Sequence, residues 1–170
     1  MKTIENLRFD EERALYASDD TEIINCRFEG PADGESALKE CNNIVVKNCY
    51  CDLRYPMWHC NGLVVEDCVQ TENCRAALWY DSGLTLKNCT LDGIKAVREC
   101  AGVKIEDCGI NSPEFGWRSR DIEITNSKVI SQYAFFESKN ITADGLELEG
   151  KYTFQYIENS TFKNCKFQTK

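Results

Sequence analysis

The chain repeats itself about every 19 residues, and this period constrains its fold more than any other feature. The segment HCNGLVVEDC at 59–68 returns as ECAGVKIEDC at 99–108, with two cysteines eight residues apart in each. One column of equivalent positions holds Leu7, Cys26, Cys49, Cys68, Cys89, Cys108, Ser127, Leu146 and Cys165. A second column, eight residues earlier, holds Ser18, Cys41, Cys60, Asp81, Cys100, Ser119, Ser138 and Ile157. Such a repeat predicts a solenoid, in which one small unit stacks on the next.

Apolar and polar residues alternate within each repeat. Val103 and Ile105, for example, alternate with Lys104 and Glu106. A period of two indicates a strand with its apolar side inward, and 19 residues are too few for a helical hairpin repeat. The sequence therefore predicts an all-β parallel β-helix with about 19 residues per rung and about eight rungs. We expect a right-handed coil, because left-handed β-helices usually carry a hexapeptide pattern that this period does not fit.

Asn or Asp comes directly before most positions of the first column. These residues are Asn6, Asn25, Asn48, Asp67, Asn88, Asp107, Asn126 and Asn164. Both residue types tolerate corners and hydrogen-bond the backbone there, so they predict a ladder of turns. Cysteine is small and weakly polar, which suits a tight interior corner, and we expect the cysteine columns to pack inside the coil. An inward Asp81 would then need a hydrogen-bonding partner.

Composition limits the classes of function. The net charge of -8 disfavours binding to nucleic acid or to an anionic membrane surface. The start of the chain lacks the apolar core of a signal peptide, and no apolar run approaches the length of a membrane span. We therefore expect a single cytoplasmic domain, residues 1–170, with reduced thiols and not disulfides. Ligands strung along a column cannot surround a zinc ion, so we expect no metal and no cofactor.

A candidate site lies in the two residues before the second column, at an outward corner. All three tryptophans and the single histidine fall in these two series. The first series is Tyr16, Lys39, Trp58, Trp79, Arg98, Trp117, Phe136 and Gln155, and the second is Ala17, Glu40, His59, Tyr80, Glu99, Arg118, Glu137 and Tyr156. Two insertions, within RFEGPADGESALKE and VQTENCRAALWY, precede this corner on the rungs either side of His59. Insertions that gather on one face often mark the binding face of a solenoid.

The aromatic and charged composition of this corner suits a sugar. The apolar face of a sugar ring packs on an indole, while its hydroxyls bond to charged side chains. We expect an oligosaccharide or nucleotide sugar to contact Arg54, Trp58, Arg75, Trp79, Tyr80, Arg98 and Trp117. The alternative is that the rings merely cover the corner, or contact another protomer.

His59, Glu40 and Glu99 are the candidates for catalysis. Glu40 and His59 lie on adjacent rungs and could form an acid/base dyad. Glu40 and Glu99 are separated by three rungs, about 14 Å, which is longer than the carboxylate spacing of glycosidases. Glu99 and Glu137, about 10 Å apart, sit at the outer limit for an inverting pair. Ordinary surface pairing explains the same residues, so the sequence leaves enzymatic activity open.

The segments FDEERALY, GPADGESALKE, LRYPMWHC, RAALWY, GIKAVREC and SPEFGW together resemble a family of short bacterial β-helix proteins classed as a domain of unknown function. The resemblance covers essentially all 170 residues. It implies a right-handed, pectate-lyase-like coil and no established activity, so it assigns no catalytic residue. Family members have more rungs after the equivalent of Phe167, so we expect a truncated member, an end capped by another protomer, or a homo-oligomer joined through open β edges.

Three functions follow as hypotheses. The first is carbohydrate binding at the tryptophan corner, and the second is an interaction scaffold that uses the same corner or the open ends. The third is an acidic DNA mimic of the pentapeptide-repeat type, suggested by the five-residue spacing of Ile157, Phe162 and Phe167. That spacing does not persist through the earlier rungs, so we rank this hypothesis last.

Overall fold

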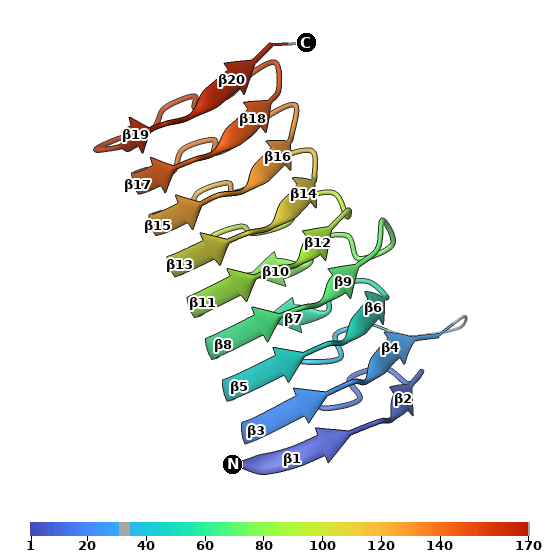
Figure 1. Cartoon of the computed structure of the whole chain (residues 1–170). Helices are drawn as coiled ribbons and strands as arrows, with labels where there is room; N and C mark the ends of the chain where they lie inside the picture. The colour runs from blue at the N-terminus through green and yellow to red at the C-terminus, as the bar shows by residue number, and fades with distance from the viewer. Residues whose placement is uncertain (31–34, 170) are drawn as a thin grey trace.

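A computed structural model describes residues 1–30 and 35–169 and shows an all-β parallel solenoid (Figure 1). The predicted fold class is confirmed, with nine turns in place of about eight. The first sheet contains β1 (Lys2–Glu5), β3 (Asp19–Ile24), β5 (Asn42–Lys47), β8 (Asn61–Glu66), β11 (Ser82–Lys87), β13 (Ala101–Glu106), β15 (Arg120–Thr125), β17 (Lys139–Asp144) and β19 (Thr161–Lys163). The second sheet contains β2 (Arg8–Phe9), β4 (Arg27–Glu29), β6 (Tyr50–Asp52), β9 (Val69–Gln70), β12 (Thr90–Leu91), β14 (Gly109–Asn111), β16 (Lys128–Ile130), β18 (Glu147–Glu149) and β20 (Lys166–Gln168).

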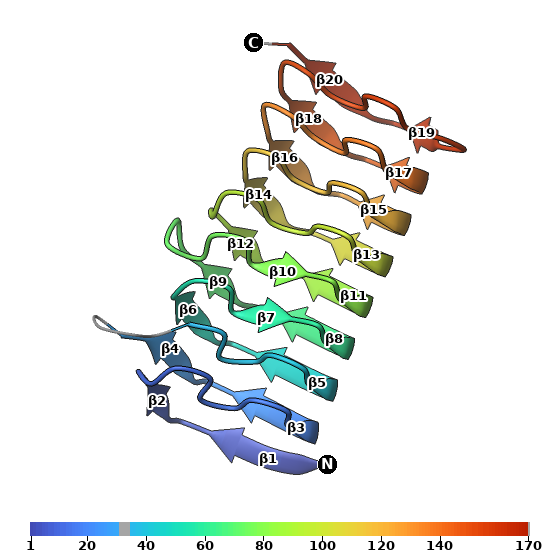
Figure 2. The same ribbon diagram turned by 180° about the vertical axis from the view of Figure 1, so that it is seen from behind.

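Each turn crosses a third face on its way from the second sheet back to the first. Here β7 (Met57–Trp58) pairs in parallel with β10 (Leu78–Trp79), and single bridges continue the pairing from Trp79 to Arg98 and from Arg98 to Trp117. Figure 2 shows β7 and β10 on the side opposite the first sheet. In Figure 1 the first-sheet strands run to the right across the front while the chain climbs, which makes the coil right-handed as predicted.

Aliphatic side chains fill the interior in columns, one residue per turn. Leu63, Leu84, Val103 and Ile122 are partners in consecutive strands of the first sheet, and all are buried. Residues of like shape therefore stack on one another, which gives the close packing that a solenoid core needs. Among the described residues the core is continuous from one end of the coil to the other.

The two cysteine columns lie inside the coil, and their side chains also bond the backbone. The Cys49 sulfur accepts the Cys26 N–H at 3.4 Å, and the Ser119 hydroxyl accepts the Cys100 N–H at 3.2 Å. All eleven cysteines are free thiols. Cysteine, serine and aspartate replace one another in these columns because each offers a small acceptor to the N–H of the turn before it.

Asp81 occupies its column inside the coil, and the partner that it requires is the Cys60 N–H, 2.8 Å from Oδ1. Its other oxygen, Oδ2, is buried without a hydrogen bond. Burial raises the pKa of the Asp81 carboxyl well above its ordinary value, although the Cys60 N–H opposes the rise.

The predicted corner ladder is present. Asn6, Asn25 and Asn48 all adopt a left-handed backbone, with φ between 51° and 59°, and the Asn25 amide donates to Asn6 Oδ1 at 2.6 Å. A second left-handed column, at Asp20, Asn43, Gly62, Gly83, Gly102, Asp121 and Asn140, lies two residues after the second cysteine column. Asn, Asp and Gly are the residues for which this conformation costs least, so both ladders follow from residue type.

Candidate functional site

The tryptophans stack on one another along the outside of the third face. The rings of Trp58 and Trp79 lie parallel, with centroids 5.0 Å apart and planes 3° from parallel. The Arg98 guanidinium lies over Trp79 at 5.1 Å and over Trp117 at 5.6 Å, and Phe136 packs beside Trp117 at 4.9 Å. We call Trp58, Trp79, Arg98, Trp117 and Phe136 the aromatic stack. It is continuous because parallel turns bring equivalent side chains within about 5 Å.

Backbone carbonyls fix the indoles against the third face. Trp58 Nε1 donates to the Ala76 carbonyl at 2.6 Å, and Trp79 Nε1 donates to the Lys95 carbonyl at 2.7 Å. Trp117 donates in the same way to the carbonyl of Tyr133. Each indole is half-buried and lies along the next turn, so its N–H is already bonded and its outer edge faces solvent.

The residue after each stack member turns the chain into the first sheet, and Glu40 does the same after Lys39, one turn before Trp58. We call these six residues the corner column: Glu40, His59, Tyr80, Glu99, Arg118 and Glu137. All six have left-handed backbones, with φ between 50° and 59°, and all are exposed. None is Gly or Asn, so each corner stores strain of about 1 kcal/mol.

Tyr80 connects the corner column to the aromatic stack. Its ring stacks on His59 at 4.8 Å and meets Trp58 and Trp79 edge-on, at 5.9 Å each. Tyr80 is nevertheless 38% exposed, so a ligand can reach it. His59, Tyr80 and the two indoles form a single cluster of rings spanning two turns.

The carboxylates of the corner column have their own partners. Glu40 accepts the hydroxyl of Tyr16 at 2.6 Å, and this hydrogen bond raises the pKa of Tyr16. Glu137 pairs with Arg118 at 3.1 Å. Glu99 lies on the corner, directly after Arg98 in the chain. Among the described residues, the two do not form an ion pair within 4.0 Å.

The structure brings most of the predicted binding residues together. Trp58, Trp79, Tyr80, Arg98 and Trp117 form one surface, and His59 joins it. Arg54 and Arg75 lie at the other edge of the third face, where Arg54 pairs with Glu35 at 3.2 Å. The assignment of these residues to ligand binding, and of His59, Glu40 and Glu99 to catalysis, stays a prediction.

Several aromatic residues near the site were not predicted. The Tyr55 ring lies 5.0 Å from Trp58, and Tyr133 stacks on Tyr152 at 5.1 Å farther along the same face. Their signal in the sequence is weak because Tyr133 and Tyr152 are 19 residues apart but their column also contains Ala76, Lys95 and Glu114.

Of the two insertions expected to precede the corner, the structure describes the second one in full. The second one forms a turn between β9 and β10, where the Cys74 N–H donates to the Thr71 carbonyl at 3.0 Å. This turn contains Arg75 and comes before β10, at the start of the third face, whereas His59 follows β7, at its end. Residues 31–34 of the first insertion lie outside the described residues.

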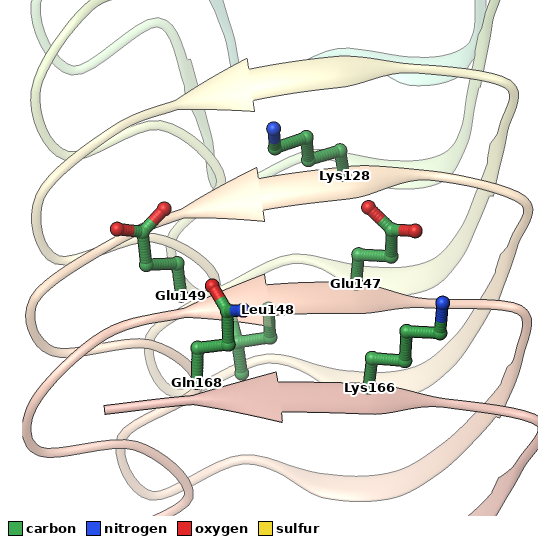
Figure 3. A pocket seen from close by; sticks show the side chains of 6 residues that line it. All are labelled: Lys128, Glu147, Leu148, Glu149, Lys166 and Gln168. Carbon is green, nitrogen blue, oxygen red and sulfur yellow. The ribbon is translucent and has the colours of Figure 1, made fainter. Parts of the chain in front are cut away.

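Shallow hollows lie on the second sheet. One of about 260 Å³ is bounded by Lys128, Glu147 and Lys166, which alternate in charge across β16, β18 and β20 (Figure 3). Another, of about 470 Å³, is lined by Arg8, Arg27 and asparagines of the corner ladder. Glu29 already takes both arginines, at 3.3 and 2.8 Å, and these contacts lower the pKa of its carboxyl.

The described residues contain no group of three or more His, Cys, Asp or Glu side chains arranged to hold a metal ion. Within 1–30 and 35–169 there is also no helix with the length and apolar character needed to cross a bilayer.

A family profile described as "Protein of unknown function (DUF3737)" matches residues 2–170. The chain belongs to this family. The predicted resemblance is thereby confirmed over residues 2–170. This DUF3737 chain has no significant match among curated proteins.

Solved structures similar to this DUF3737 chain are also β-helices. A glycoside hydrolase matches with a TM-score of 0.56 and 12% identity, over 89% of this chain and 37% of its own. PfbA, a surface adhesin of Streptococcus pneumoniae, matches with a TM-score of 0.40 and 9% identity, over 89% of this chain and 46% of its own. The chain thus spans less than half of either protein. The first likeness shows the fold alone, and the second is too weak to support an argument.

Proposed function

We propose that the protein binds an oligosaccharide or sugar derivative along the third face, on the aromatic stack and the corner column. The observation that carries the proposal is the continuous run of Trp58, Trp79, Arg98 and Trp117, with exposed His59 and Tyr80 beside it. Aromatic edges supply apolar contact, and the adjoining charged side chains supply hydrogen bonds.

The geometry favours an extended ligand. Successive stack members are related by one turn of the coil, about 4.8 Å, so the same pattern of ring and polar group recurs along the axis. A chain of linked sugars offers apolar and hydroxylated surface that also recurs along its length. Because the indole N–H groups are bonded to carbonyls, hydroxyl recognition falls to His59, Tyr80 and Glu99.

Binding is a better use of this surface than catalysis. Glu40 is bonded to Tyr16, and Glu137 is paired with Arg118, so two of the corner carboxylates already have partners. The His59 ring lies nearly parallel to that of Tyr80, with centroids 4.8 Å apart. Catalysis by an acid/base pair would require the imidazole of His59 and a corner carboxylate to approach the same reacting group, whereas ligand binding does not require this.

The test is calorimetric titration with a panel of neutral and acidic oligosaccharides. A His59→Ala, Tyr80→Ala double variant removes an exposed stacked pair next to the tryptophans. The matched control is Tyr133→Ala, Tyr152→Ala, which removes a stacked pair of similar geometry, 5.1 Å and 13°, about three turns along the same face. We expect at least a tenfold loss of affinity in the first variant and little change in the control. An equal loss in both, or no sugar binding by the wild type, would contradict the proposal.

An interaction scaffold is the second candidate, and a specific observation favours it. Tyr156, Tyr152 and Tyr133 are 78%, 40% and 36% exposed on the same face, and single-domain proteins seldom expose such a cluster without a partner. The Tyr133→Ala, Tyr152→Ala variant tests this directly. If these rings join two copies, the wild-type mass in light scattering rises with concentration and the variant stays monomeric.

A further inference from the structure

Among the residues that the structure describes, no carboxylate lies within 4.0 Å of the Arg98 guanidinium, although the protein is acidic. Six of the eight arginines, namely Arg8, Arg13, Arg27, Arg54, Arg118 and Arg120, lie within 4.0 Å of a carboxylate. Arg98 and Arg75 do not, among the ion pairs of the described residues. With 28 Asp and Glu in the chain, an unpaired guanidinium on the face that carries all the tryptophans calls for an explanation.

The residues around Arg98 exclude water from its Nε atom but do not offer that atom a hydrogen bond. Trp79 and Trp117 enclose the guanidinium from both sides, at 5.1 and 5.6 Å, and Nε is buried with no hydrogen-bond partner. A cation between two rings gains about 0.5–1 kcal/mol from each at an exposed site. That gain does not satisfy an N–H donor, and an unbonded buried donor costs about 1–3 kcal/mol. The residue as a whole stays partly exposed, so a ligand can approach it.

A guanidinium held in this way is prepared for an anion. Its plane is fixed by two indoles, so little side-chain freedom is lost when it binds, and its donors match a carboxylate or a phosphate. Two charged pairs lie on neighbouring turns: Lys95 is 4.0 Å from Glu114, and Arg118 pairs with Glu137. Glu99 follows Arg98 in the chain, and among the described residues no ion pair joins the two.

We propose that Arg98 binds the negative group of an acidic sugar, either the carboxylate of a uronic acid or the phosphate of a sugar phosphate, while the edges of Trp79 and Trp117 contact the ring. This rests on the proposed function and gives it a substrate class. The charge of the protein as a whole, -8, repels such a ligand, so the attraction is local to this position.

The experiment compares three probes by calorimetry on the full chain: trigalacturonic acid, glucose 1-phosphate, and neutral maltotriose. Each is titrated into the wild type, Arg98→Gln, Arg98→Lys and Arg13→Gln. The Arg13 variant removes the same charge at an arginine that pairs with Glu12 at 3.6 Å and does not belong to the expected binding residues. Circular dichroism and the unfolding midpoint establish that each variant is folded.

We expect one of the acidic probes to bind at least tenfold more tightly than maltotriose to the wild type. That preference should disappear in Arg98→Gln, fall in Arg98→Lys because an ammonium cannot form the paired contact, and persist in Arg13→Gln. Which acidic probe binds decides between carboxylate and phosphate. Equal binding of all three probes would overturn this inference and leave the sugar site standing. Equal losses in the Arg98 and Arg13 variants would show that the effect is general electrostatics and would overturn the inference too. Binding of no probe would contradict both proposals.

Discussion

At the scale of single residues, the cysteine-rich columns work as acceptors for the backbone. Several column residues accept an N–H from the equivalent residue of the preceding turn, as the Ser127 hydroxyl does for the Cys108 N–H at 3.1 Å. Packing alone, which the sequence predicted for these residues, would accept alanine equally well. The hydrogen bonds explain why cysteine alternates with serine and aspartate instead.

Ser119 allows this to be measured. Replacing Ser119 by Ala leaves the Cys100 N–H buried without an acceptor, and we expect the free energy of unfolding to fall by about 1–3 kcal/mol. Ser119→Cys keeps an acceptor of the type found at the equivalent position of other turns and should cost less. Urea unfolding of the two variants provides the comparison. Equal stability of the two would show that the acceptor is irrelevant.

Asp81 gives a pH-dependent prediction at the same scale. Burial raises its pKa in the folded protein, so the folded chain keeps a proton that the unfolded chain, with an ordinary pKa of about 3.9, releases. The free energy of unfolding therefore decreases as pH rises from about 4 toward the folded pKa. Asp81→Asn should be more stable than the wild type at pH 7 and less dependent on pH in this range.

The matched control for Asp81 is Asp107→Asn, an exposed position of the corner ladder. Urea unfolding at pH 4.5 and pH 7 measures all three proteins. We expect Asp107→Asn to follow the wild type. A stability difference between Asp81→Asn and the wild type that does not change with pH would refute the titration of Asp81.

At the scale of elements, left-handed corners determine where each strand begins and ends. Gly102, with φ of 69°, occupies the second ladder next to Gly83 and in register with Asn43. A Cβ at this position would have its closest contact at 3.6 Å from the Gly83 nitrogen, so there is room for a methyl group. The cost of Gly102→Ala is therefore conformational and not steric.

We expect Gly102→Ala to lower the free energy of unfolding by about 1 kcal/mol, and Gly102→Asn to lower it by less, since Asn tolerates this backbone. Thermal unfolding of both variants checks the order. Alanine at least as stable as asparagine would contradict the assignment of a left-handed backbone.

The sequence predicted the strands, the first ladder and the corner because these depend on residue type repeating at a fixed period. It did not predict the second ladder, where Asp, Asn and Gly share a backbone conformation rather than a side-chain chemistry. Phe115 shows another limit. It is buried directly before Gly116, and Gly116 lies in register with the buried residues Met57, Leu78, Val97 and Phe135. A Cβ on Gly116 would lie 2.8 Å from the Phe135 ring. Such exchanges between neighbours depend on packing that periodicity does not encode.

At the scale of the whole molecule, the right-handed coil converts a linear pattern into a surface. Residues about 19 apart become neighbours, so Trp58, Trp79 and Trp117 meet in one stack although 59 residues separate the first from the last. The repeat likewise predicts which rings are neighbours, as His59 and Tyr80 are, because they hold equivalent positions in consecutive turns. The repeat does not predict the orientation of the indoles, because that depends on their hydrogen bonds to the carbonyls of Ala76, Lys95 and Tyr133.

The most direct test uses the fact that every tryptophan of the chain lies in the aromatic stack. Tryptophan emission is measured while trigalacturonic acid, glucose 1-phosphate or maltotriose is added, with calorimetry on the same samples. We expect a saturable change in emission with the same midpoint as the calorimetric binding curve, since a ligand on the third face alters the surroundings of these indoles. Calorimetric binding of a sugar without any change in tryptophan emission would place its site elsewhere and contradict the account.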